Sequence, residues 1–311
     1  MSTPRRALVT GGAGFIGRHL VRALLGRGVE VRVLDDLSVG VRDALPSDVE
    51  LLVGDVRDAS LVTRALHGID AVFHLAARVS IRGSVERLRD DFDVNLGGTL
   101  TLLEALRGAR VSRFVNVSSM AVYADSAADA FIAEDYTTRP LSPYGASKLA
   151  AEHYTRIVTG MFGVSHVNLR YFNTYGPGQA VSPYVGVATI FIDQLLRGER
   201  PTILGDGAQR RDFVHVDDIV AATTAALDAP VDGETVNVGT GRATTVGELA
   251  ALLCAKIAPA LLPVHAPPRA EELRSSVADI TRARRLLGFT PRETLDLDGV
   301  IAFWRERHAQ R

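Results

Sequence analysis

A glycine-rich segment near the N terminus constrains the fold of this chain more than any other feature. The sequence GGAGFIG, residues 11–17, follows the apolar run 7–9 and precedes a segment with apolar residues at helical spacing. Closely spaced glycines at a strand-to-helix turn let the backbone approach a pyrophosphate, whose charge the helix N terminus favours. The same pattern also fits a tight turn without a ligand, so the surrounding sequence must decide between them.

The N-terminal half of the chain supplies that context. Short apolar runs alternate with helical patterns, which is typical of βαβ units around a parallel sheet. The runs lie at 7–10, 30–34, 50–53, 71–75 and 113–117. We therefore predict an α/β protein with a doubly wound parallel sheet.

Proline and glycine become frequent in the middle of the chain. They gather at 139–143 and again at 175–184, where YGPGQAVSPY excludes a regular element. A second, smaller lobe is predicted to begin near Asn173. The later run TVNVGTG, 235–241, is predicted as a further strand, so the two lobes are expected to interleave along the chain.

Composition narrows the classes of partner. The 311 residues include 35 Lys and Arg against 36 Asp and Glu, which gives no electrostatic reason to expect nucleic acid or an anionic membrane. No apolar run has the length of a membrane span, and the start does not resemble a signal peptide, so we expect a cytoplasmic protein. The single cysteine, Cys254, cannot form an intramolecular disulfide and is predicted to be a core residue.

Acidic residues after the second and third predicted strands bear on the nucleotide. Asp35 ends the second strand, eighteen residues beyond Gly17, where a carboxylate would bind both ribose hydroxyls. A 2′-phosphate would face Asp35 and Asp36 together, with a repulsion of a few kcal/mol. The pattern therefore favours NAD over NADP. Asp55, in GDVRD, is a candidate acceptor for the adenine amino group or a residue of a solvated turn.

The segment LSPYGASK carries a candidate acid–base pair. Ser142 suits a helix N-cap and Pro143 the first helical position, which places Tyr144 in the first turn. Lys148 lies one turn later on the same face. The pKa of a phenol is near 10 and must fall by about three to let it act as a base at neutral pH, whereas one nearby cation lowers the pKa by about one to three. We expect an oxidised nicotinamide ring to add the rest; a coincidental exposed Tyr and Lys is the alternative.

Hydroxyls and histidines also lie beside other predicted strands. Ser118 and Ser119 follow an apolar run at the expected carboxyl edge of the sheet, where a hydroxyl can bond to a reacting alcohol. His74 and His215 have no companions at ligand spacing, so we predict structural hydrogen bonds and no metal site. The run RARRLL, 282–287, is predicted as a solvated helix face.

Together, TGGAGFIG, Asp35, SSMAVY and YGASK resemble the extended short-chain dehydrogenase/reductase family, specifically its NAD-dependent nucleotide-sugar epimerases and dehydratases. RYFNTYGPG at 170, GDGAQRRDFVHVDD at 205 and ADITRARRLLGF at 278 extend the resemblance over nearly the whole chain, which is most similar to the UDP-hexose 4-epimerases. It implies a Rossmann domain that retains NAD, at 1–172 and about 213–242. The smaller α/β lobe, at 173–212 and 243–311, would bind the nucleotide sugar.

The resemblance also implies a reaction. Tyr144 would be the base, Lys148 its pKa partner and Ser119 a hydroxyl on the proton path. The 4,6-dehydratases carry acids after this hydroxyl, whereas Met120 and Ala121 cannot move a proton, which disfavours elimination. Tyr144 would remove the 4-hydroxyl proton as hydride passes from C4 to NAD, and the 4-keto sugar would turn and take the hydride back on its other face.

The site implied by the resemblance has a cofactor part and a substrate part. The cofactor residues are Gly11, Gly14, Phe15, Ile16, Gly17, Asp35, Asp36, Ser38, Gly40, Asp55, Val56, Leu75, Ala76, Ala77, Asn95, Ser118, Tyr144, Lys148 and Tyr171. The substrate residues are Ser80, Ser119, Tyr144, Val187, Thr202 and Leu204, with Asn173, Arg211 and Arg269 on the diphosphate, Glu272 on a ribose hydroxyl, and Ser276. Glucose-restricted 4-epimerases carry a bulky Tyr where this chain has Ser276, so an N-acetyl group would fit, and Ser275 after a one-residue slip would leave the same room.

Two departures from the family pattern and three rival functions stay open. Val79 replaces a Lys found beside the nicotinamide in some members, and Ala124 replaces a glycine before the unusual loop ADSAADAF. The rivals are a UDP-glucuronate 4-epimerase, a 4-ketoreductase of nucleotide sugars, and a non-catalytic dinucleotide sensor, against which Tyr144 and Lys148 count. A homodimer through helices near 97–107 and 145–160 is also implied.

Overall fold

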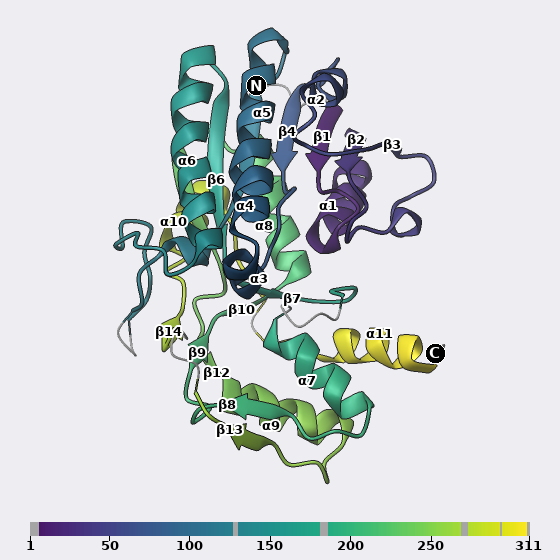
Figure 1. Cartoon of the computed structure of the whole chain (residues 1–311), viewed down its shortest axis with the longest axis vertical. Helices are drawn as coiled ribbons and strands as arrows, with labels where there is room; N and C mark the ends of the chain where they lie inside the picture. Colours follow the sequence, from purple (N-terminus) through teal and green to yellow (C-terminus); the bar gives the residue numbers. More distant parts are fainter. Residues whose placement is uncertain (1–5, 127–129, 181–185, 269–272, 293, 310–311) are drawn as a thin grey trace.

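A seven-stranded parallel sheet organises the larger part of the molecule (Figure 1). The computed structural model describes residues 6–126, 130–180, 186–268, 273–292 and 294–309. The strand order is β11-β6-β5-β4-β1-β2-β3, and neighbouring strands all run parallel. The strands are β1 (Arg6–Thr10), β2 (Glu30–Asp35), β3 (Glu50–Val53), β4 (Ala71–His74), β5 (Arg113–Ser119), β6 (Ser165–Tyr171) and β11 (Glu234–Val238). The predicted doubly wound α/β fold is confirmed.

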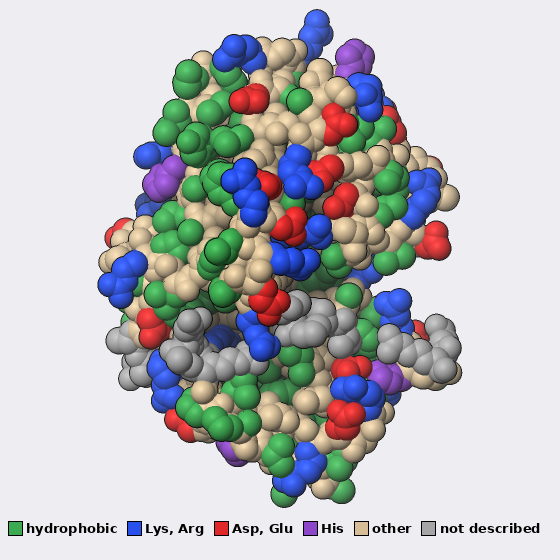
Figure 2. Space-filling view, in the orientation of Figure 1, with side chains coloured by type: hydrophobic (Ala, Val, Ile, Leu, Met, Phe, Trp, Pro, Cys, Tyr) green, Lys and Arg blue, Asp and Glu red, His purple; other side chains and the backbone are tan. Residues whose placement is uncertain are grey.

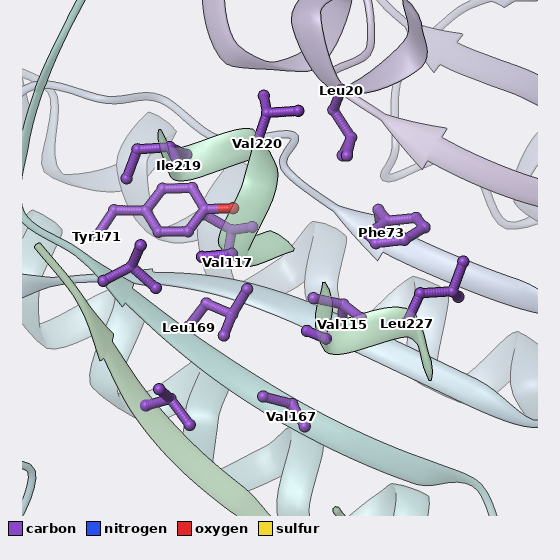
Figure 3. Close-up of a cluster of buried hydrophobic side chains, with 14 of the residues drawn as sticks. Leu20, Phe73, Val115, Val117, Val167, Leu169, Tyr171, Ile219, Val220 and Leu227 are labelled. Atoms are coloured by element: carbon purple, nitrogen blue, oxygen red, sulfur yellow. The ribbon is translucent and has the colours of Figure 1, made fainter. Parts of the chain in front are cut away.

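Helices cover both faces of the sheet, because its apolar strands must be shielded from water on both sides. Alternation along β1 shows this directly: Ala7 and Val9 join one core, whereas Leu8 joins the other. Figure 3 shows part of the first core, where Leu20 of one helix and Ile219 of another face the sheet. The first face carries α1 (Phe15–Gly26), α8 (Val216–Asp228) and α10 (Thr281–Leu287), and the second carries α2 (Ala59–Ala65), α5 (Gly98–Ala105) and α6 (Pro143–Phe162).

The smaller lobe is built on short strand pairs and three helices (Figure 1). β7 (Asn173–Tyr175) pairs with β10 (Phe213–His215), β8 (Thr202–Leu204) with β13 (Val264–Ala266), and β9 (Arg210–Arg211) with both β12 (Thr244–Thr245) and β14 (Ser275–Ser276). The helices are α7 (Val187–Leu196), α9 (Val246–Ile257) and α11 (Asp298–Ala309). Their apolar faces form a separate core that includes Cys254, buried as predicted.

The chain passes between the two parts more than once. The predicted strand at 235–241 is β11, which pairs with β6 at the edge of the main sheet. Helix α10 also returns to the main sheet, where Ala283 and Leu287 join the first core, although it lies in the range assigned to the smaller lobe. The predicted domain boundaries are therefore crossed by packing at the C-terminal end.

Short helical turns connect the remaining segments. They are α3 (Ile81–Glu86), α4 (Leu88–Phe92), a π-helical turn (Asp93–Gly97) and 3-10 turns at Arg42–Ala44, Leu106–Gly108 and Met120–Val122. Among the helices of the described residues, none is long and apolar enough to cross a membrane.

Candidate active site

The glycine turn lies where the strand order of the sheet reverses. β1 is flanked by β2 and β4, and ligands of open parallel sheets bind at the carboxyl ends beside such a reversal. Gly11 has a φ of +70°, and a Cβ there would lie 2.8 Å from the backbone nitrogen of Ala76. A Cβ on Gly17 would lie 2.1 Å from the carbonyl oxygen of Gly11. The turn is therefore too tight for side chains.

The start of α1 has the properties of an anion site. Its N-cap residue, Gly14, offers no side-chain hydrogen bond, and the first turn holds no acidic residue. The amide groups of that turn, including those of Phe15 and Ile16, are left for an external acceptor. A pyrophosphate fits these amides and the positive end of the helix dipole.

Replacing Gly17 by alanine tests this tight turn. Because the added carbon overlaps backbone, we expect a loss of about 1–3 kcal/mol or more in the free energy of unfolding and at least about a hundredfold weaker NAD binding. Gly26→Ala in the same helix is the matched control, since nothing lies within 4 Å of a Cβ there. Denaturation midpoints and calorimetric NAD titration measure both effects. Unchanged NAD affinity in Gly17→Ala would contradict the assigned role of the turn.

Asp35 supports the turn as well as facing the predicted ribose position. Its carboxylate accepts hydrogen bonds from the backbone amides of Ala13 and Leu37, each at 2.9 Å. Burial raises the pKa of this carboxyl group. Gly40 packs against the same carboxylate. Because an ionised carboxylate offers about four acceptor positions, two bonds leave capacity for the predicted ribose contact.

The neighbouring acidic residues are also engaged within the protein. Asp36 accepts from the backbone and hydroxyl of Ser38 at 2.9 and 2.6 Å. Ser38 in turn accepts from the guanidinium of Arg78 at 3.2 Å, across the end of β1. Asp55 pairs with Arg57, whose hydrogen bonds hold the pKa of this carboxyl below its usual value. The sequence did not reveal these partners.

The start of α6 brings the predicted catalytic residues together. Ser142 accepts from the amide of Gly145 at 3.1 Å, which confirms the predicted N-cap. A Cβ on Gly145 would lie 2.1 Å from the carbonyl oxygen of Ala121, so the helix packs directly on the turn after β5. Ser119 ends β5, its hydroxyl accepts from the amide of Ala121 at 3.2 Å, and it lies close enough to the phenol of Tyr144 to lower the pKa of that group. The fold therefore brings Ser119 and Tyr144 together, and their catalytic roles stay predictions.

Burial shifts the pKa values of both Tyr144 and Lys148. Burial raises the pKa of Tyr144 to about 12; the Ser119 bond opposes this and the charge of Asp91 adds to it. Burial lowers the pKa of Lys148 to about 8, while Glu152 and Asp91 act in the other direction. Lys148 has no hydrogen-bond acceptor or ion-pair partner within the described residues, although it is 3% exposed. Burial thus acts against a phenolate at Tyr144, and the charge of an oxidised nicotinamide stays the predicted source of a lower pKa.

Other predicted cofactor residues lie around the same edge of the sheet. The buried hydroxyl of Ser118 has no hydrogen-bond partner in the described part of the chain, which fits a contact with a ligand. Asn95 is buried and accepts from the amide of Arg78 at 2.7 Å. Tyr171 lies in the core beside Ile219 (Figure 3), and its hydroxyl bonds to Thr223 at 2.5 Å. The structure thus does not bring the Tyr171 phenol to the edge, and its predicted cofactor contact stays a prediction. Leu75, Ala76 and Ala77 directly follow β4, and Val56 follows β3.

The predicted substrate residues come from several elements of the smaller lobe. The side-chain amide of Asn173 donates to the hydroxyl of Ser276 at 3.2 Å. Ser276 is fully buried and pairs in register with Arg211. These three residues are therefore neighbours. Ser80 caps α3 by accepting from Gly83, Val187 begins α7, and Thr202 and Leu204 are the first and last residues of β8. Arg269 and Glu272 lie outside the described residues.

The structural hydrogen bonds predicted for the two histidines are present. His74 bonds to Thr10 and Thr99, and His215 accepts from the amide of Asp217 at the start of α8. No three His, Cys, Asp or Glu side chains of the described ranges are grouped as ligands for a metal ion.

Figure 2 shows an indentation between the larger and the smaller part of the molecule, with basic and acidic side chains mixed on the surface above it. A doubly wound sheet with a tight glycine turn at its reversal point, and a Ser-Tyr-Lys cluster beside it, defines an enzyme that binds a dinucleotide. Residues 7–239 match the model of the NAD dependent epimerase/dehydratase family. The chain belongs to this family.

Relatives within the family cover this chain almost completely. It is 39% identical over 312 residues to a UDP-glucose 4-epimerase of Mycolicibacterium smegmatis, covering 97% of this chain and 99% of the relative. A UDP-glucose 4-epimerase structure with UDP-glucose from Thermotoga maritima has a TM-score of 0.93 at 36% identity, covering 97% and 99% of the two chains. A UDP-N-acetylglucosamine 4-epimerase from Methanobrevibacter ruminantium M1 has a TM-score of 0.93 at 31% identity, covering 98% and 99%.

Proposed function

We propose that this protein is an NAD-dependent nucleotide-sugar 4-epimerase that inverts C4 of a UDP-hexose through a transient 4-keto sugar. The observation that carries the proposal is that Ser119, at the carboxyl end of β5, lies close enough to the phenol of Tyr144 to lower its pKa, while Lys148 lies one helical turn further along α6. The relatives named UDP-glucose 4-epimerase support the same reaction.

The residues of the chain divide the work of the reaction. Tyr144 accepts the proton of the sugar 4-hydroxyl. The hydroxyl of Ser119 lies on the proton path and hydrogen-bonds to the oxygens of the Tyr144 phenol and of the sugar 4-hydroxyl. Lys148 stabilises the phenolate by its positive charge. The glycine turn at 11–17 would hold NAD, which would supply a reversible hydride acceptor for C4 of the sugar. Ser119 is followed by Met120 and Ala121, which cannot act as acids, so the site supports inversion rather than loss of water.

The pH dependence of the reaction follows from Lys148. Its pKa is lowered to about 8 by burial, so the ammonium loses its proton as the pH rises through that value. The phenolate then loses its stabilising charge, and we expect kcat/KM to fall above about pH 8. In Lys148→Arg the charge persists to far higher pH, so the alkaline fall should disappear even though the geometry is altered. An alkaline fall that persists unchanged in this variant would belong to another group.

The pocket for the sugar is proposed to accept more than glucose. The proposal rests on the small side chain of Ser276, at the position where glucose-restricted 4-epimerases carry a bulky Tyr; in the structure Ser276 is buried and bonded to Asn173. Proton NMR of the purified protein with UDP-glucose, UDP-N-acetylglucosamine and UDP-glucuronate tests this directly. Inversion at C4 without added NADH supports the epimerase. Net consumption of NADH would indicate a ketoreductase, activity on the uronate alone the uronate epimerase, and no turnover the sensor.

The oligomeric state is part of the proposal. The outer face of α6 exposes Tyr154, Ile157 and Met161, and nearby Leu88 and Phe92 of α4 are also exposed. Such a row of apolar side chains is typical of a surface that another chain covers. We propose a homodimer through this face. Light scattering of the purified protein measures it, and Ile157→Glu should shift the mass toward the monomer.

A further inference from the structure

A continuous line of buried hydrogen bonds joins the end of β1, directly before the glycine turn, to the neighbourhood of the proposed catalytic residues. His74 ends β4 and lies in register with Thr10, the last residue of β1. Its Nδ1 atom is 2.8 Å from the hydroxyl of Thr10, and its Nε2 atom is 2.9 Å from the hydroxyl of Thr99. The amide of Ala76 donates to Thr10 at 3.2 Å, and Thr99 donates to the carbonyl of Asn95 at 2.6 Å.

The donors and acceptors along this line determine the tautomer of the imidazole. A carbonyl oxygen only accepts, so the single proton of the Thr99 hydroxyl is committed to Asn95. Thr99 must therefore accept from His74, which places the ring proton on Nε2. Nδ1 is then an acceptor for the hydroxyl of Thr10. Burial lowers the pKa of His74 to about 3, and the charge of Lys148 adds to this, so the ring is neutral.

The far end of the line is Asn95, whose side chain joins two parts of the active site. Its amide nitrogen donates to Asp91 at 3.0 Å and to the hydroxyl of Ser147 at 3.2 Å. Ser147 in turn donates to the backbone carbonyl of Tyr144 at 2.9 Å. Asn95 lies in the π-helical turn Asp93–Gly97, a distortion that is frequent at functional sites. The line from His74 thus reaches the main-chain carbonyl of Asn95, and the side chain of the same residue contacts the first turn of α6 through Ser147.

We propose that His74 is a positioning residue of the active site. Its neutral imidazole is held in one orientation by Thr10, directly before the glycine turn, and by Thr99. Through Thr99 it fixes the position of Asn95, and through Asn95 the positions of Tyr144 and Lys148. The ring does not exchange protons during turnover. A neutral ring suits this task because a second ring proton would face the hydroxyl proton of Thr10. This inference rests on the proposed function for its kinetic consequences only, since the geometry of the line is independent of the reaction.

Two amide variants test the two hydrogen bonds of the His74 ring separately. His74→Gln can place an amide donor near the position of Nε2 and keep the bond to Thr99, whereas His74→Asn can keep the bond to Thr10 and lose Thr99. We expect kcat for C4 inversion to fall about tenfold to a hundredfold in His74→Asn, with KM within twofold, and clearly less in His74→Gln. Thr99→Val should lower kcat as much as His74→Asn does. The double variant His74→Asn/Thr99→Val should have a kcat no lower than either single variant. Thr99→Ser keeps the hydroxyl and should have the wild-type kcat.

A matched variant and a spectroscopic measurement guard against a purely structural explanation. Leu249→Ala removes buried apolar contacts in the smaller lobe, so it lowers the melting temperature without touching this line. If His74→Asn melts earlier but keeps kcat within twofold, as expected for Leu249→Ala, the positioning role is overturned. A shift of about one unit in the acid limb of the pH profile in His74→Gln would also overturn it, because it would indicate proton exchange.

The ring itself can be observed without turnover. In protein labelled with ¹⁵N-histidine, and assigned by the signal lost in His74→Gln, we expect the shifts of a neutral Nε2–H ring from about pH 5 to pH 8. A charged ring or the Nδ1–H tautomer would overturn the inference. Failure of the proposed function would appear separately, as a wild-type protein that inverts no nucleotide sugar while these ring signals stay as expected.

Discussion

Tyr144→Phe is expected to lower the rate of C4 inversion by about three orders of magnitude or more while the protein keeps its NAD. The change removes one oxygen atom, and with it the group that accepts the 4-hydroxyl proton. The aromatic ring can stay in place, because phenylalanine has the same shape and the side chain of Tyr144 is buried. Proton NMR of the sugar measures inversion, and the NAD released on denaturation measures cofactor content.

Tyr154→Phe is the matched control for this prediction. Tyr154 lies on the same helix, α6, but its side chain is 46% exposed, so its hydroxyl should not matter for the reaction. We expect wild-type rates from this variant. Near-normal inversion by Tyr144→Phe would refute the assigned base, and loss of NAD from it would show that the change had disturbed the fold instead.

Local sequence patterns predicted most of the architecture. The alternation of apolar runs located β1 to β5, and TVNVGTG located β11, because parallel strands buried on both faces have a recognisable composition. Ser142 and Pro143 located the start of α6 because capping chemistry acts over three or four residues. Features set by neighbouring residues were therefore accessible from the sequence.

Contacts between distant residues were not accessible in this way. The partners of His74 lie 64 and 25 residues away, and nothing in the local sequence identifies them. The return of α10 to the main sheet depends on the same kind of packing, so the simple division of the chain missed it. The Tyr144–Lys148 spacing indicated attraction between a cation and a phenolate, but burial, which raises the pKa of Tyr144, depends on the whole fold.

A buried ion pair one helical turn from Lys148 is the site of the largest expected loss of stability. The guanidinium of Arg170 donates to both carboxylate oxygens of Glu152, at 2.9 and 2.7 Å, and both side chains are 6% exposed. Arg170 also donates to the hydroxyl of Tyr123 at 2.8 Å and lies 4.7 Å from the centre of that ring. Replacing Arg170 therefore removes a hydrogen-bond donor from both Glu152 and Tyr123.

Arg170→Met is expected to lower the free energy of unfolding by about 3–5 kcal/mol, because it leaves the carboxylate of Glu152 buried without its counterion. The double variant Glu152→Gln/Arg170→Met should recover part of this loss, since no buried charge is then unpaired. Urea midpoints of the single and double variants measure the difference. The stranded carboxylate would also hold the pKa of Lys148 higher than in the wild type, because Glu152 already acts on it in that direction. A double variant less stable than Arg170→Met would show that the Glu152 carboxylate is stabilised by another group, such as the ammonium of Lys148, and is not an unpaired charge after the loss of Arg170.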